Sequence, residues 1–255
     1  MTLWLIVALV FTILLLSVLP GMYFWWPSRK EAASRSDLGV ALMTGALIAL
    51  GVLGLQVVLD VRLSEVEEER RVAQEEQALK LQLALQGRLV GIPLEQKKLD
   101  GIYLYEKDLT NANLRRADLT GAVLTRSDLT RAKLQDAILV GADLNGTTLV
   151  EARLHRANLE NAILSDAPMK GARLPYARLR NAVLSGAKLR YADLTGARLQ
   201  KASLSEADLR GAVLTRAQFD GETELEKAKY DRYTIWPTGH EQPACKKAVC
   251  EVGPA

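Results

Sequence analysis

The sequence predicts an all-β solenoid with square coils, preceded by an α-helical transmembrane hairpin. Two observations predict this architecture. Leucine recurs at every fifth position from Leu94 to Leu214, interrupted only by Met169, and two long runs without charged side chains occupy most of the first sixty residues. An internal repeat this regular sets the architecture of a domain, and an uncharged run of about 20 residues is long enough for a membrane span.

The five-residue period excludes the two ordinary elements. On an α-helix, five residues turn the chain by about 500°, so the leucines would form no stripe. On an unbroken strand, an odd period would send every second leucine to the opposite face. Short extended segments separated by corners keep all the leucines on one side, and four right-angle corners close a coil of about 20 residues.

The interior of the predicted solenoid is filled by leucine and alanine. From Ala112 to Ala217, the residue two before each repeat centre is Ala in 20 of 22 cases, and the exceptions are Ser127 and Thr147. Residues two apart on an extended segment point the same way, so each Ala lies beside its Leu. The solenoid core is therefore predicted to include Leu119, Leu124, Leu144, Leu164, Leu184 and Leu204.

Individual repeats carry a family resemblance. Segments 117–121 and 192–196 both read ADLTG, which closely resembles the A(D/N)LXX unit of pentapeptide-repeat proteins. The resemblance implies a right-handed quadrilateral β-helix with Leu at the interior centre. Segment 81–86, leading into Gly91, is similar to the entry of membrane-anchored bacterial members, and segment 230–239 looks like a terminal cap of the family. The resemblance implies little about activity, because one scaffold serves several roles.

The first sixty residues predict a two-helix membrane hairpin (residues 1–60). Residues 1–28 carry no charge, and residues 38–59 form a second uncharged run between Asp37 and Asp60. A helix of about 22 residues spans about 33 Å, enough for the hydrocarbon core of a bilayer. The first run could instead be a cleaved signal peptide, but it lacks a basic n-region and its apolar stretch is too long.

The helices of the hairpin carry few signals of packing or orientation. Ala41, Gly45 and Ala49 fall four apart, a spacing that lets helices approach closely within the hairpin or between protomers of a homo-oligomer, or that arises by chance. The positive-inside rule does not decide the orientation, because the basic residues that flank the second span balance at three against three. These residues are Arg29, Lys30 and Arg35 before the span and Arg62, Arg70 and Arg71 after it. A cytoplasmic repeat domain is expected from the resemblance, which is mostly to cytosolic proteins.

Three further segments follow the hairpin. Residues 61–90 predict a helical linker that continues the second span, with Glu67 and Arg71, and Glu76 and Lys80, paired at i,i+4. Residues 91–220 form the repeat domain. Its first coil is expected to be sealed by bulky or polar residues in the alanine positions, which are Ile92, Lys97, Ile102 and Lys107. Residues 221–255 are expected to form an aromatic cap and a loose tail.

Composition and motifs exclude several classes of function. The net charge of +3 over 255 residues is nearly balanced, which argues against a dedicated nucleic-acid partner. The sequence has no phosphate loop, nucleophile elbow or zinc spacing, so no catalytic residue, cofactor or metal is expected and the protein is not expected to be an enzyme. Cys245 and Cys250 are either incidental or form a local disulfide.

Function is therefore expected from outward side chains of the solenoid. Residues 20 apart stack in columns, which brings together a basic contact strip consisting of Lys133, Arg153, Arg173, Arg178 and Arg198. Such a strip suits anionic headgroups or an acidic partner, or it is simply a solvated face. The favoured function is a membrane-tethered scaffold that binds a protein partner of unknown identity. The alternative is the topoisomerase-protecting role known in the family, which relies on an acidic, DNA-like rod and is disfavoured here by the basic repeat surface and the membrane anchor.

Overall fold

The computed structural model describes the backbone of residues 33–239 and the side chains of residues 43–239. The chain divides into two compact units, Met1–Ala73 and Gln74–Ala255. The first predicted span, the cysteine pair and the end of the predicted tail lie outside the described residues.

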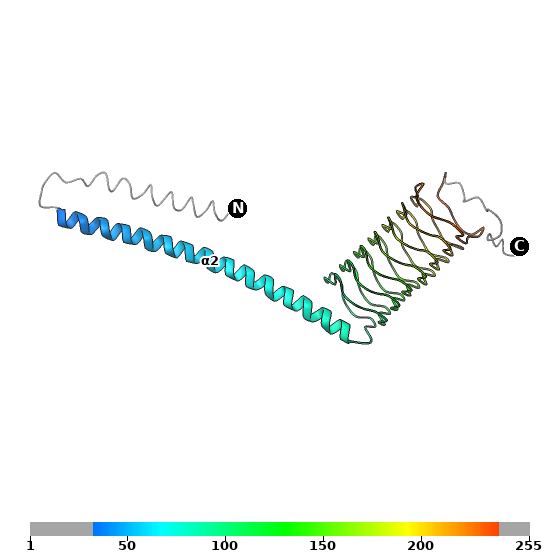
Figure 1. The fold of residues 1–255 in the computed structure, drawn as a ribbon, viewed down its shortest axis with the longest axis horizontal. Coiled ribbons are helices and arrows are strands. Elements are labelled where there is room, and N and C mark those ends of the chain that lie inside the picture. Colours follow the sequence, from blue (N-terminus) through cyan, green and yellow to red (C-terminus); the bar gives the residue numbers. More distant parts are fainter. Residues whose placement is uncertain (1–32, 240–255) are drawn as a thin grey trace. The chain divides into compact units, whose positions relative to one another are not determined.

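The long helix α2 (Ala33–Leu85) contains both the predicted second span and most of the predicted linker (Figure 1). Its sequence is rich in leucine, alanine, glutamate and glutamine, which favour helix, and the charged part carries i,i+3 ion pairs from Arg62 to Glu65 and from Arg71 to Glu68. No described side chain between residues 43 and 59 is buried. By length and composition, α2 is the one helix among the described residues that could cross a membrane.

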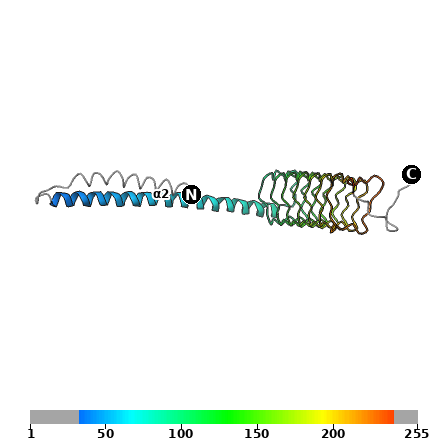
Figure 2. The same cartoon turned by 90° about the horizontal axis from the view of Figure 1, so that it is seen from above.

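The repeat region forms stacked coils of 20 residues, as Figures 1 and 2 show. Parallel bridges join outward residues 20 positions apart, from Arg88 and Asp108 at one end to Arg198 and Gln218 at the other. In a typical repeat, the Leu164 N–H donates to the carbonyl of Val183 at 2.7 Å. Each side of a coil contributes a single paired residue, so the described residues contain no strand of ordinary length. The extended segments predicted from the period are therefore single-residue bridges between coils.

Each corner of a coil is a β-turn that begins at the repeat leucine. The Ala167 N–H donates to the Leu164 carbonyl at 3.2 Å, and the third residue of this turn, Asp166, has a φ of 56°. Every fifth residue from Gly91 to Arg216 has a φ between 54° and 71°. A positive φ at the third position defines a type II turn. The corners that the period predicted are thus a chain of similar turns with one left-handed residue each.

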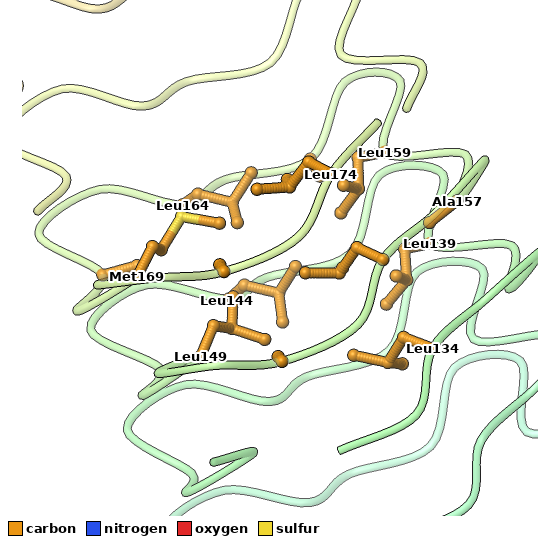
Figure 3. Close-up of a cluster of buried hydrophobic side chains, with 14 of the residues drawn as sticks. Leu134, Leu139, Leu144, Leu149, Ala157, Leu159, Leu164, Met169 and Leu174 are labelled. Carbon is orange, nitrogen blue, oxygen red and sulfur yellow. The ribbon is translucent and has the colours of Figure 1, made fainter. Parts of the chain in front are cut away.

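The core is the interior column of leucines and alanines (Figure 3). The predicted core leucines are at most 1% exposed, and they are Leu119, Leu124, Leu144, Leu164, Leu184 and Leu204. Figure 3 shows Leu144 and Leu164 in successive layers, with Leu149 and Met169 beside them in the same two layers. Full burial of a leucine side chain contributes about 1.5–3 kcal/mol, so the stacked layers supply most of the driving force for this unit.

The polar exceptions in the alanine positions are also buried. The Ser127 hydroxyl donates to the Leu104 carbonyl and accepts the Lys107 N–H at 3.1 Å, so it bridges two backbone groups of the preceding coil. The Thr147 hydroxyl donates to the Leu124 carbonyl at 2.6 Å. Burial of a hydroxyl costs free energy unless it is hydrogen-bonded, and both side chains meet that condition.

The last turns of α2 cover the first coil within the unit that starts at Gln74. Leu83 is 1% exposed and joins the core, and the Lys107 ammonium donates to the Ala84 carbonyl at 2.7 Å. The i,i+4 pair predicted between Glu76 and Lys80 is wrong. Both residues bind the first coil: Lys80 pairs with Asp100 at 2.9 Å and Glu76 pairs with Lys98 at 3.5 Å. Solvated i,i+4 pairs are weak, so contacts with a packed neighbour take precedence.

At the far end, the coils continue beyond the predicted boundary at residue 220. Bridges still form from Ser203 to Glu224 and from Val213 to Ile235, although the spacing widens from 20 residues to 21 and then 22. Tyr230 is 9% exposed and meets Trp236 edge to face, with ring centroids 5.5 Å apart. Tyr230 belongs to the buried core, and Phe219 and Trp236 pack against it, so aromatic side chains take over from leucine at this end.

Candidate interaction surface

The outward residues form columns along the solenoid, one residue per coil. Lys133, Arg153 and Arg173 lie in one column, linked by bridges. Arg178 and Arg198 lie in a second column and are bridged to each other. All five side chains of the basic contact strip are exposed. The strip therefore consists of two separate columns.

The second column borders a groove with a volume of about 790 Å³. The groove is open to solvent and crosses several coils. Its lining residues come from the column of Arg178 and from the neighbouring corner column, and they are Asp136, Ala137, Ile138, Arg156, Asn158, Tyr176, Arg178, Gly196, Arg198, Arg216 and Gln218. Lys133, Arg153 and Arg173 do not line it. Only the second of the two basic columns therefore contributes to the groove.

Four arginines line the groove, and two of them are neutralised by carboxylates. The Arg156 guanidinium lies 3.2 Å from Asp136, and the Arg178 guanidinium lies 2.9 Å from Glu160. Arg198 and Arg216 form no ion pair with any residue that the structure describes. A guanidinium that keeps its donors free presents a fork that fits a carboxylate in a bidentate manner.

One wall of the groove depends on a close contact between Tyr176 and Gly196. A Cβ atom placed on Gly196 would lie 2.7 Å from Cδ1 and from Cε1 of Tyr176, so the ring lies directly on the backbone of the next coil. His155 meets this ring edge to face, with centroids 5.9 Å apart. The tyrosine ring thus contacts residues of the coils on both sides of it and forms one wall of the groove.

Two corner residues of the groove are missing from the strip predicted from the sequence. Arg216 and Tyr176 follow their repeat leucines by two residues, whereas the predicted strip contains residues from the sides of the coils. This corner position is the one with a positive φ. A signal for it exists in the sequence, because the glycines of the repeats gather at this position and mark it as a left-handed corner.

Several other surface charges form local pairs. Burial opposes ionisation of Asp208, but hydrogen bonds from Arg210 outweigh it and lower the pKa of Asp208. On another column, the hydrogen bond from Arg131 at 2.8 Å lowers the pKa of Glu151. Both ion pairs keep their carboxylates ionised. Neither Asp208 nor Glu151 is held neutral for proton transfer.

The chemistry of the surface suits binding. No group of three or more His, Cys, Asp and Glu side chains that could hold a metal ion occurs within residues 43–239. The groove holds guanidinium groups, amides and one tyrosine, which recognise anions by hydrogen bonds and charge.

Comparison with known proteins gives a family and several solved structures. The model for "Pentapeptide repeats" matches eight copies, in segments that together run from residue 108 to residue 221. No curated protein matches the chain. HetL, a pentapeptide repeat protein involved in heterocyst differentiation regulation in the cyanobacterium Nostoc sp. strain PCC 7120, is 33% identical, and the match covers 62% of this chain and 78% of HetL with a TM-score of 0.44.

Two further solved structures are more distant or shorter matches. A pentapeptide repeat protein from the Arabidopsis thaliana thylakoid lumen is 33% identical, over 38% of this chain and 66% of that protein, with a TM-score of 0.30. A trypsin-treated form of QnrB1, a plasmid-mediated fluoroquinolone resistance protein, is 19% identical, over 57% of this chain and 87% of QnrB1, with a TM-score of 0.32. From the repeat match and the identity to HetL, the chain belongs to the pentapeptide repeat family, whose fold is the right-handed quadrilateral β-helix.

Proposed function

We propose that this protein is a membrane-tethered, non-enzymatic scaffold whose solenoid presents side-chain columns to a partner protein. The proposal rests on the presence of two features in one chain. One is an apolar helix in which no side chain between residues 43 and 59 is buried, and the other is a solenoid with an arginine-lined groove. Apolar side chains in such numbers need a cover, and a bilayer provides one for a helix of this length.

The tether is proposed to be a two-span hairpin in residues 1–60, with the solenoid on the cytoplasmic side. The apolar part of α2 supplies the second span. Support for the first span comes from the sequence, in which residues 1–28 carry no charge. The balanced flanking charges do not fix the orientation, so it needs a direct measurement.

Topoisomerase protection by DNA mimicry fits this surface poorly. That role relies on an acidic rod, whereas residues 92–220 contain 20 Lys and Arg against 15 Asp and Glu. A basic surface presents the wrong sign of charge to an enzyme site that binds DNA phosphates. The similarity to QnrB1 concerns the repeat fold alone, and the charge of the solenoid distinguishes the two roles.

Membrane fractionation tests the tether. The full chain should stay in the membrane pellet after washing with alkaline carbonate and with high salt, and a chain that begins at Val61 should be soluble. Electrostatic attachment through surface arginines would be lost in salt, because each charge contributes about 1 kcal/mol and is screened. Recovery of the full chain in the carbonate wash would refute the tether.

Thiol labelling in the same cells tests the orientation. After reduction, a membrane-impermeant thiol reagent should leave Cys245 and Cys250 unlabelled in intact cells and should label them after the membrane is opened. Labelling in intact cells would place the solenoid on the outer side and contradict the cytoplasmic assignment.

A further inference from the structure

We propose that the arginine-lined groove is the docking site for an extended acidic segment of a partner protein. The inference deepens the proposed scaffold function and rests on it, because it names the surface and the chemistry of the partner. Exposed cations, an aromatic wall and a concave surface coincide at this groove.

Two of the four arginines in the groove can each bind a carboxylate of a ligand. Arg156 and Arg178 already have acidic partners, Asp136 and Glu160, at 3.2 and 2.9 Å. Arg198 and Arg216 have none among the described residues, and Arg198 is exposed where it lines the groove. A ligand with two suitably spaced carboxylates would give each free guanidinium a bidentate partner.

The spacing of the arginines matches an extended chain along the solenoid axis. Arg178 and Arg198 are bridged neighbours on successive coils, so their backbones are about 4.8 Å apart. Arg156 and Arg216 are three coils apart in the corner column, which corresponds to about 14 Å. An extended peptide rises about 3.3 Å per residue, so a segment of about five residues passes all four arginines.

The walls of the groove favour a peptide over other anions. Tyr176 is 51% exposed and Ile138 is 40% exposed, and both offer apolar surface to the side chains between the carboxylates. Nucleic acid and anionic bilayers bind through many phosphates at once, and their affinity scales with the number of cations that meet them. Two unpaired arginines in a concave site are too few for that mode but are sufficient for two carboxylates.

Binding of defined probes to the full-length protein in detergent tests the inference. The main probe is a fluorescein-labelled peptide of about eight residues in which glutamate alternates with serine, long enough to cross the groove. It should bind, and the variant Arg198→Gln/Arg216→Gln should weaken binding about tenfold, since each of the two exposed guanidinium–carboxylate pairs is worth up to about fivefold. The control Arg115→Gln/Arg180→Gln removes two exposed arginines outside the groove and should change affinity less than about twofold.

Four results would overturn the inference. The first is a wild-type chain that does not bind the peptide, and the second is equal loss of peptide binding in the groove variant and the control, which would indicate unspecific charge attraction. The third is tighter, arginine-dependent binding of a poly-dT oligonucleotide or of phosphatidylglycerol vesicles. The fourth is self-association of the full chain that is lost in Arg198→Gln/Arg216→Gln, which would make the glutamate-rich segment 65–69 of a second copy the occupant.

Failure of the inference is distinguishable from failure of the proposed function. A membrane-extracted chain that co-purifies equally with one defined partner in the wild type and in Arg198→Gln/Arg216→Gln would retain the scaffold function but exclude the groove. Arginine-dependent peptide binding by a chain that carbonate releases from membranes would retain the groove and exclude the tether.

Discussion

Replacement of Gly196 by alanine tests whether the close contact with Tyr176 holds neighbouring coils together. Gly196 has a φ of 65°, and an added Cβ would lie 2.7 Å from the Tyr176 ring. Gly121 has a φ of 63°, and an added Cβ there would meet nothing within 4 Å. The two sites therefore share the same left-handed backbone and differ in the space beside it.

The expected cost follows from this difference. An alanine in the left-handed region costs about 1–2 kcal/mol at either site. Only Gly196→Ala also displaces Tyr176, which loses its edge-to-face contact with His155, worth about 0.5–1.5 kcal/mol, and must leave its rotamer at a cost of about 0.5–1.5 kcal/mol. Gly196→Ala should therefore destabilise the solenoid by about 1–3 kcal/mol more than Gly121→Ala.

Thermal unfolding followed by far-UV circular dichroism measures the difference. For a unit of this size, 1 kcal/mol corresponds to about 2–4 °C in Tm, so the two variants should be separated by several degrees. In Tyr176→Ala, the further change Gly196→Ala should cost no more than Gly121→Ala does. Equal melting temperatures for the two single glycine variants would refute the argument from the ring contact.

Three further predictions concern the core, a buried hydroxyl and a surface carboxylate. Leu164→Asp should unfold the solenoid because it buries a carboxylate without a partner, whereas the outward change Asp143→Ala should alter stability by less than about 1 kcal/mol; equal losses in thermal melts would contradict the inside–outside assignment. Ser127→Ala should cost about 1–2 kcal/mol in urea unfolding, because the partly buried Lys107 N–H loses its hydroxyl acceptor; an unchanged unfolding midpoint would contradict this role of the hydroxyl. The pKa of Asp208 is lowered, so this carboxylate stabilises the fold above pH 3.8, its ordinary pKa, and the stabilisation is lost as the pH falls through the lower folded-state pKa. Asp208→Asn should therefore make the free energy of unfolding depend less on pH in acid. An unchanged pH dependence would show that Asp208 does not contribute to acid unfolding.

The expected loss of stability in acid comes from the hydrogen bonds between Arg210 and Asp208. Asp208 accepts two hydrogen bonds from the Arg210 guanidinium, at 2.8 and 2.7 Å, and the fold holds both groups in this geometry. Protonation of Asp208 removes the negative charge that strengthens both hydrogen bonds. Protonation therefore raises the free energy of the native state more than that of the unfolded state, and the protein is destabilised in acid. The matched change Asp143→Asn alters a carboxylate on another column and serves as the control for general acid effects.

The features that were predicted from the five-residue repeat, namely the coil and its leucine interior, agree with the structure. A leucine at every fifth position can be buried throughout only by a coil with four corners, and the structure buries Leu119, Leu164 and the other repeat leucines from Leu94 to Leu214 to 2% exposure or less. A helix leading into the repeats was expected from composition and from i,i+4 charges, and α2 extends to Leu85. The specific i,i+4 pairs were wrong. Arg71 pairs with Glu68 and not with Glu67, and Glu76 and Lys80 both contact the first coil.

The period, the coil length and the interior of the solenoid follow from the amino-acid sequence alone, because a five-residue repeat of leucine leaves one arrangement that buries every copy. The meeting of particular outward residues depends on the folded chain. Arg178 and Arg198 line the same groove as Arg216 because corners and sides from different coils converge there, and Tyr176 lies on Gly196 because that residue has no side chain. The stacking of Arg178 on Arg198 follows from the 20-residue coil, but the meeting of a corner residue such as Arg216 with residues of the neighbouring side depends on side-chain direction, which the repeat period does not give.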